Sequence, residues 1–295
     1  MSMHLLGDLV AVIAPVLITV TVGFCWGKAD LPFDTNQITR LITLVGTPCL
    51  VVSTLLKVSP SLDALGTVAL ISVISHTIIG LVGFILLKGA RLPNKHYLPA
   101  MIFANNGNLG LPLCFFAFGE SGLALAIAYF TVTALGQFTV GQAIAAGRGS
   151  TKQVFRTPLI LGVAVAVVLV ATEIHLPRWA SNTVDLIGQF TIPLMLLALG
   201  VSLSRLQVST LARSSTLAGL RIVGGLGLGL LLAVLFGLEG EERGVVLIQA
   251  SMPVAIFNYL FAQFYGNRPE EIAGIVVIST AMSFIVLPFL LAAVL

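Results

Sequence analysis

Long apolar stretches run along almost the whole chain, and short polar connections separate them. A helix that crosses a bilayer needs roughly 20 apolar residues, and ten stretches meet this length. Unbroken apolar runs argue against a membrane barrel, whose strands alternate in polarity over about ten residues. The pattern therefore predicts an all-α integral membrane protein with ten transmembrane helices. Their approximate bounds are 5–26, 36–56, 64–87, 97–118, 121–146, 158–174, 180–203, 211–236, 243–264 and 270–294.

The composition agrees with this pattern. Of the 295 residues, 57% are hydrophobic and only 9% are charged, and the mean hydropathy is +1.06. About a quarter of the residues in a soluble domain are charged, so this chain lacks an ordinary water-facing surface. The net charge of +3 arises from basic residues scattered through short loops. The lipid bilayer is therefore the expected environment, and nucleic acid is not an expected partner.

The distribution of basic residues predicts the orientation of the chain. Eleven lysines and arginines lie in or near loops on the side opposite the termini, against three on the side of the termini. Lysine and arginine are concentrated in cytoplasmic loops of membrane proteins. We therefore expect a multi-pass protein of the cell inner (plasma) membrane, with both termini periplasmic or extracellular and the 147–157 loop cytoplasmic.

The two halves of the chain resemble each other. TPCLVVSTLL (47–56) lies in the second span and IPLMLLALGV (192–201) in the seventh, and their prolines, Pro48 and Pro193, are 145 positions apart. The same shift moves ANNGNLGLP (104–112) close to ASMPVAIFNY (250–259) in the ninth span. Because each half has an odd number of spans, the halves must have opposite topology in the membrane. The expected units are 1–146 and 158–295, each a five-helix repeat, joined by the linker 147–157.

The fourth span contains residues that interrupt helices. Proline removes a backbone donor and clashes with the carbonyl four residues earlier, and glycine lowers the cost of unwinding. Gly107, Gly110 and Pro112 therefore predict two half-helices joined by an extended crossing, and Pro253 predicts the same in the ninth span. Free backbone groups at membrane depth are tolerated where they line a protein cavity. Interrupted spans at matching places in two inverted halves indicate a substrate site.

Polar side chains accompany the predicted crossing. Asn105, Asn106, Asn108 and Asn258 supply neutral donors and acceptors where the N-termini of half-helices are expected to converge. Such N-termini attract a carboxylate or another small anion. The alternative is that these residues only join helices together, but three asparagines in four positions favour a binding site. Thr47 and Thr191 stand beside Pro48 and Pro193. One interpretation is that these prolines are ordinary kinks of a membrane helix, and the alternative is that the neighbouring threonine hydroxyls contact the ligand.

Three further polar residues are candidates for coupling. His76 lies inside a span, and an unperturbed histidine has a pKa near neutrality, so proton coupling and a plain helix contact are both open. Asp185, about one turn into the seventh span, is a second candidate or an interface residue. We expect Arg221, about two turns into the eighth span, to snorkel toward the cytoplasm, and attraction of an anionic substrate is the alternative. No cofactor or metal site is expected, and coupling to H⁺, to Na⁺ or to neither stays open.

The sequence lacks the motifs of an enzyme. It contains neither HExxH nor GxSxG, and no pair of carboxylates lies inside a span. These motifs supply the metal ligands or the nucleophile of common hydrolases. We therefore do not expect an enzyme.

Four segments resemble the auxin efflux carrier family, which includes the plant PIN-formed auxin transporters and bacterial relatives linked to dicarboxylates such as malonate and malate. They are NNGNLGLPL (105–113), TPCLVVSTLL (47–56), IPLMLLALGVSL (192–203) and SMPVAIFNYLFAQFYG (251–266), and the resemblance covers essentially the whole chain. It implies ten spans in two inverted five-helix repeats, with crossed, broken helices 4 and 9. This architecture is similar to that of the bile-acid symporters.

The resemblance also implies roles for individual residues. Asn105, which opens the motif of the fourth span, would bond the substrate carboxylate. Pro112 and Pro253 would be the crossover prolines, and Gln137 matches more loosely a glutamine near the pocket of the plant members. The plant members carry a long hydrophilic loop at mid-chain, whereas this chain has only 147–157. Regulation by phosphorylation of that loop is therefore not expected here.

The expected function is secondary transport of a small organic anion, either a carboxylate or a dicarboxylate, auxin-like or malonate/malate-like. By resemblance, spans 3–5 and 8–10 would move against a scaffold of spans 1, 2, 6 and 7, giving alternating access of the elevator or rocking type. A homodimer through the scaffold helices is a further expectation. The alternative function is a passive channel or uniport facilitator for the same class of solute.

Overall fold

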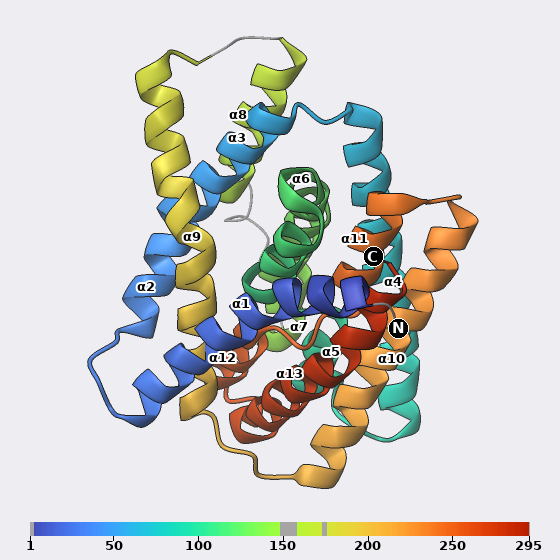
Figure 1. The fold of residues 1–295 in the computed structure, drawn as a ribbon. Coiled ribbons are helices and arrows are strands. Elements are labelled where there is room, and N and C mark those ends of the chain that lie inside the picture. The colour runs from blue at the N-terminus through green and yellow to red at the C-terminus, as the bar shows by residue number, and fades with distance from the viewer. Residues whose placement is uncertain (1–2, 148–157, 173–175, 295) are drawn as a thin grey trace.

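The computed structural model describes residues 3–147, 158–172 and 176–294 of the chain, and Figure 1 shows its helical architecture. Residues 148–157, most of the predicted linker, lie outside the described residues. The α-helices are α1 Met3–Lys28, α2 Thr35–Leu41, α3 Thr47–Val58, α4 Leu62–Gly89, α5 Asn94–Ile102, α6 Leu111–Gly136, α7 Gln142–Ala146, α8 Pro158–Ala171, α9 Arg178–Arg205, α10 Leu211–Leu235, α11 Gly240–Ala250, α12 Ile256–Tyr265 and α13 Pro269–Ala292. Three short π-helices join some of them: η1 Ile42–Gly46, η2 Asn106–Gly110 and η3 Gln137–Gly141.

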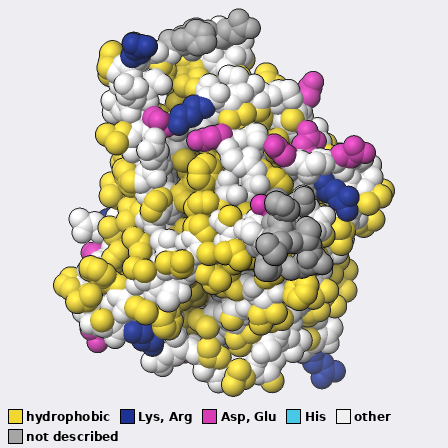
Figure 2. Space-filling view, viewed as in Figure 1, with side chains coloured by type: hydrophobic (Ala, Val, Ile, Leu, Met, Phe, Trp, Pro, Cys, Tyr) yellow, Lys and Arg dark blue, Asp and Glu magenta, His cyan; other side chains and the backbone are white. Residues whose placement is uncertain are grey.

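The helices are those of a multi-pass membrane protein. Within the described residues, seven helical stretches are long and apolar enough to cross a bilayer, and Leu161–Ala171 forms a shorter apolar helix. The seven are Gly7–Lys28, Thr35–Val58, Leu62–Gly89, Asn106–Ala146, Arg178–Arg205, Leu211–Leu235 and Pro269–Ala292. Large hydrophobic side chains such as Ile85, Val223 and Ile285 are exposed. Figure 2 shows hydrophobic side chains over most of one face, with charged side chains gathered toward its ends.

The longest of these stretches, Asn106–Ala146, is not one straight helix. Gly119 has φ 66° and ψ −153°, a backbone conformation that residues with a Cβ rarely adopt. It divides α6 into two arms, 111–118 and 120–136. This position coincides with the connection that the hydrophobic pattern predicts between the fourth and fifth spans.

Two interrupted helices cross near the centre of the molecule. Phe103–Asn105 separates α5 from η2, and Ser251–Ala255 separates α11 from α12. Ala104 and Val254 form an isolated antiparallel bridge. The Asn105 N–H donates to the Pro253 carbonyl at 2.7 Å, and the Ala255 N–H donates to the Phe103 carbonyl at 3.2 Å. The non-helical segments therefore satisfy part of each other's backbone at a depth where water is excluded.

The structure corrects the predicted role of Pro112. The break in the fourth span precedes it by several residues, and Pro112 stands just inside α6, after the π-helix η2. Pro48 has the same relation to η1. Proline clashes with the carbonyl four residues earlier, and a π-turn relieves this clash because its hydrogen bonds span five residues. These two prolines therefore adjoin widened turns, whereas Pro253 lies in the crossing itself.

The helices pack in two groups. The helix α9 packs against α1, α2 and α3, and α3 also packs against α8. In the other group α4 packs against α5 and α6, α10 against α11 and α13, and α12 against α13. Contacts of α3 and α1 with α6, and of α9 with η2, join the two groups. The crossing segments lie at the ends of helices of the second group, next to this junction.

Candidate functional site

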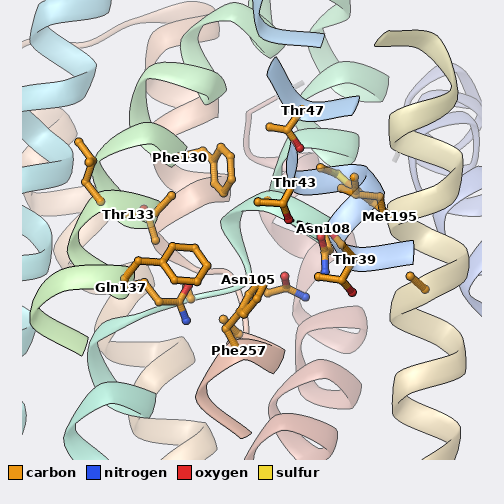
Figure 3. A pocket seen from close by; sticks show the side chains of 18 of the residues that line it. Thr39, Thr43, Thr47, Asn105, Asn108, Phe130, Thr133, Gln137, Met195 and Phe257 are labelled. Carbon is orange, nitrogen blue, oxygen red and sulfur yellow. Dashed lines mark hydrogen bonds between the residues drawn. The ribbon is translucent and has the colours of Figure 1, made fainter. Parts of the chain in front are cut away.

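A cavity of about 200 Å³ lies beside the crossing. Its volume suits a small organic molecule and falls below the roughly 300–1,000 Å³ typical of sites for drug-sized ligands. Figure 3 shows side chains converging on it from both helix groups. Its walls include polar, aromatic and aliphatic residues: Thr39, Ile42, Thr43, Leu44, Thr47, Ala104, Asn105, Gly107, Asn108, Phe130, Thr133, Ala134, Leu135, Gln137, Phe138, Met195, Ala198, Ala255 and Phe257.

Asn105 occupies the junction between the crossing and the cavity. It precedes η2, its φ and ψ are −80° and 52°, and its side chain is buried. The backbone N–H is held by Pro253 and the backbone carbonyl accepts from the Leu109 and Gly110 N–H groups. The side-chain Nδ2 is buried and has no hydrogen-bond partner among the described residues. A rigid backbone thus presents an unused amide donor in the cavity wall, and a buried donor without a partner costs about 1–3 kcal/mol.

The electrostatics of the cavity favour an anion. Among the described residues, no side chain with a formal charge lines it. Two helical segments begin at it, because Asn105, Gly107 and Asn108 belong to the start of η2, and Ala255 and Phe257 to the start of α12. The first N–H groups of a helix point outward unpaired and carry a partial positive charge. Carboxylates and phosphates bind at such places.

All three π-helices of the described chain border the cavity. Lining residues come from η1 (Ile42, Thr43), from η2 (Gly107, Asn108) and from η3 (Gln137). π-Helical residues make up well under 1% of proteins and occur mostly at functional sites. Their convergence on one cavity is therefore an indication of function that is independent of the asparagines.

Of the predicted substrate-binding residues, the structure brings Asn105, Asn108, Gln137 and Thr47 to the cavity. The side chains of Asn106 and Asn258 instead form hydrogen bonds that hold the crossing segments together. The Asn106 Nδ2 donates to the carbonyl and to Oε1 of Gln249, both at 2.6 Å. The Asn258 Nδ2 donates to the Phe103 carbonyl at 2.9 Å, and its Oδ1 lies 3.5 Å from Gln137 Nε2.

The other predicted residues lie around the site. The buried Thr191 hydroxyl donates to the Ile187 carbonyl at 3.2 Å, one turn earlier in α9. Pro193 lies inside the same helix. At Gly110 a Cβ would overlap the side chain of Gln249, and at Gly107 it would reach the Phe130 ring. Both glycines therefore permit a close approach around the crossing.

Two of the coupling candidates lie away from the cavity. His76 Nδ1 is 2.7 Å from the Ser72 carbonyl, and its ring is stacked on Phe103 with centroids 5.8 Å apart. Its Nε2 is buried without a partner among the described residues. Asp185 pairs with Lys57 and accepts from Gln189 Nε2 at 3.0 Å. Neither side chain lines the cavity.

The prediction that Arg221 snorkels toward the cytoplasm is wrong. Its residue surface is only 3% exposed, and Nη1 donates to the Ala250 carbonyl at 3.1 Å. Ala250 is the last residue of α11, directly before the crossing. The carbonyls at a helix C-terminus carry a partial negative charge, so the guanidinium is held inside the bundle by the broken helix.

Several lining residues were not singled out from the sequence. Thr39 and Thr43 precede the predicted Thr47 at intervals of four residues, the spacing of one helix face, and Figure 3 shows all three beside the cavity. This repeat is a signal that the sequence contains. The aromatic rings of Phe130 and Phe257 have no such signal, because isolated aromatics in apolar spans are indistinguishable from core residues.

The architecture and the cavity together define a multi-pass helical membrane protein with an internal polar site. Comparison with known proteins agrees. Residues 147–291 match the family described as "Membrane transport protein". An uncharacterized transporter of Methanocaldococcus jannaschii is 28% identical over 199 residues, 63% of this chain and 64% of that protein. An uncharacterized transporter of Methanothermobacter thermautotrophicus is 25% identical over 269 residues, 86% of this chain and 87% of that protein.

These matches support the resemblance to the auxin efflux carrier family read from the sequence: the second half of the chain matches a family of membrane transport proteins, and the chain is similar to two archaeal transporters. The family and both relatives are described as transporters and not as enzymes. The first alignment spans less than two thirds of that relative's length. The substrate of this chain is therefore proposed from its own site.

Proposed function

We propose that this chain is a secondary transporter that binds a small organic anion through a carboxylate at the crossing. The observation that carries the proposal is the buried Nδ2 of Asn105, a cavity-wall residue, which has no hydrogen-bond partner among the described residues. A carboxylate would accept from this amide and lie beside the positive start of η2. The apolar rings of Phe130, Phe138 and Phe257 would contact the remainder of the ligand.

We also propose that the chain crosses the membrane ten times. The two arms of α6 would be separate crossings, because Gly119 divides them. The first arm would combine with α5, and the second with η3 and α7. Together α11 and α12 would make one further crossing, and α8 another. This arrangement gives two five-helix halves, each with one interrupted span, and opposite topology for the halves.

The proposed mechanism is alternating access of the elevator or rocking type. The division of packing into two groups supports it, since α1, α2, η1, α3, α8 and α9 would form the scaffold. The cavity is lined from the scaffold by Thr39, Thr43 and Met195 and from the moving group by the crossing, so it lies at their boundary. Relative motion of the groups would carry a ligand held by the crossing past the scaffold.

Charged contacts at the other end of this boundary are consistent with such motion. Lys57 of α3 pairs with Asp185 of α9, and its Nζ lies 3.8 Å from Glu120 at the start of the second arm of α6. The Lys57–Glu120 contact joins the two groups at the end proposed to face the outside. Exposed ion pairs contribute about 0–1 kcal/mol, so this contact can break at low cost during a transport cycle.

Counterflow in proteoliposomes tests the proposed function. Vesicles containing the purified protein are preloaded with unlabelled malonate or indole-3-acetate, and uptake of the same labelled compound is followed at several pH values, with and without Na⁺. A carrier gives a transient accumulation that saturates with substrate. A passive channel gives simple equilibration, and the absence of any carboxylate flux above that of empty vesicles would contradict the proposal.

A further inference from the structure

Arg221 is a buried charge without a carboxylate partner in the part of the chain that the structure describes. Among the buried polar residues of the described chain, only Arg221 has a formal charge. None of the ion pairs between described residues includes Arg221. Its Nη1 has the Ala250 carbonyl, whereas Nε is buried and has no partner among the described residues. Such a charge inside a membrane protein is costly and is rarely kept without a role.

The broken helix compensates this charge only in part. Ala250 ends α11, and the C-terminus of a helix is equivalent to roughly half a negative charge. The helices α10 and α11 approach closely here, because a Cβ at Gly225 would overlap the Ala250 carbonyl and approach Arg221 Nη1. The region behind the crossing therefore retains excess positive charge when the cavity is empty.

A short chain of contacts connects Arg221 with the cavity. Gln249 precedes Ala250, and both its carbonyl and its Oε1 accept from Asn106 Nδ2 at 2.6 Å. Asn106 in turn follows Asn105, which lines the cavity. Arg221 itself does not line the cavity, so it acts on a bound ligand through space and not by contact.

We infer that Arg221 is the fixed counter-charge of the bound anion and makes the site selective for a carboxylate over a neutral analogue. The inference rests on the proposed function, because it requires an anion at the crossing. The described side chains of the cavity wall are neutral, so they can also bind the amide of a ligand, and the helix N-termini carry only a partial positive charge. The charge of Arg221 distinguishes the two, because its field is weakly screened in the protein interior.

The size of this effect follows from the separation of the two charges. For any two unit charges about 10 Å apart at an effective dielectric constant of about 20, the interaction changes affinity about tenfold, and we take this as the scale of the effect. A residue that only capped α11 would behave differently. Its removal would weaken the crossing and would lower binding of a charged ligand and of a neutral ligand alike.

The test compares paired ligands of the same shape, indole-3-acetate with indole-3-acetamide and malonate with malonamide. Dissociation constants are measured by competition for the wild type, Arg221→Met, Arg221→Lys and the control Arg213→Met, which removes an exposed charge from the same helix. We expect Arg221→Met to weaken carboxylate binding about tenfold with unchanged amide binding. Arg221→Lys should keep the carboxylate preference, and Arg213→Met should match the wild type.

Equal losses for the carboxylate and its amide, or unchanged carboxylate affinity in Arg221→Met, would overturn the inference and leave the proposed function intact. A wild-type protein that binds and moves no carboxylate would overturn both. Thermal unfolding of each variant accompanies the binding data. Arg221→Gln keeps a donor for the Ala250 carbonyl and makes the same comparison if the methionine variant does not fold.

Discussion

Replacement of Asn105 by alanine should weaken binding of the ligand without lowering the stability of the fold. The side-chain Nδ2 has no partner among the described residues, so its removal breaks no hydrogen bond of that atom within the described protein. The backbone bond from the Asn105 N–H to the Pro253 carbonyl at 2.7 Å does not depend on the side chain. A hydrogen bond to a charged group contributes about 1.5–3 kcal/mol, so Asn105→Ala should weaken carboxylate binding about 10- to 150-fold.

The adjacent residue provides the matched control. Asn106 is equally buried, but its Nδ2 donates to two acceptors of Gln249. Asn106→Ala removes the donor to the buried Gln249 Oε1, at a cost of about 1–3 kcal/mol of folding free energy, whereas the Gln249 carbonyl still accepts from the Met252 N–H at 3.4 Å. We therefore expect Asn106→Ala to lower the unfolding temperature, whereas Asn105→Ala should not lower it.

The assay combines equilibrium binding of a labelled carboxylate with thermal unfolding, both in the same detergent. The account requires opposite phenotypes for the two variants. Unchanged carboxylate affinity in Asn105→Ala would refute the assignment of the ligand donor. A large loss of thermal stability in Asn105→Ala would show that its side chain has a structural partner instead.

Two further predictions concern the cavity wall and the topology. In Gly107→Ala the added Cβ would lie 2.8 Å from the Phe130 ring, so the ring must shift into the cavity; binding of indole-3-acetate should fall more than that of malonate, and equal effects would contradict this geometry. A cysteine introduced at Ser150, in a variant with Cys25, Cys49 and Cys114 replaced, should react with a membrane-impermeant maleimide from the cytoplasmic side only, and labelling from the outside would reverse the proposed orientation.

The crossing was predictable because its causes are local. Glycine and asparagine at 105–110 and Pro253 in the ninth span are unfavourable in a regular membrane helix, and the repeat of 145 positions related the two segments. The position of the break was not predictable to the residue. Pro112 indicates that a regular turn cannot form there, but a π-turn and a complete break both satisfy that condition.

The environment of Arg221 could not be read from the sequence. A long cationic side chain two or three turns inside a span can reach the interface or turn inward, and both outcomes have the same sequence pattern. The deciding partner, the Ala250 carbonyl, is 29 residues away and belongs to a different helix. The sequence also could not show that Asn105 lines the cavity whereas Asn106 bonds to Gln249. Adjacent residues point in different directions, and their partners are far away in the sequence.

The measurement that tests the central claim most directly is an experimental structure of the protein with a bound carboxylate. Indole-3-acetate or malonate, whichever the binding assay selects, is added at saturation. The account predicts ligand density between Asn105, Gln137 and the start of η2, with the carboxylate within hydrogen-bond distance of Asn105 Nδ2. An occupied site elsewhere in the protein, with the cavity beside the crossing empty, would contradict it.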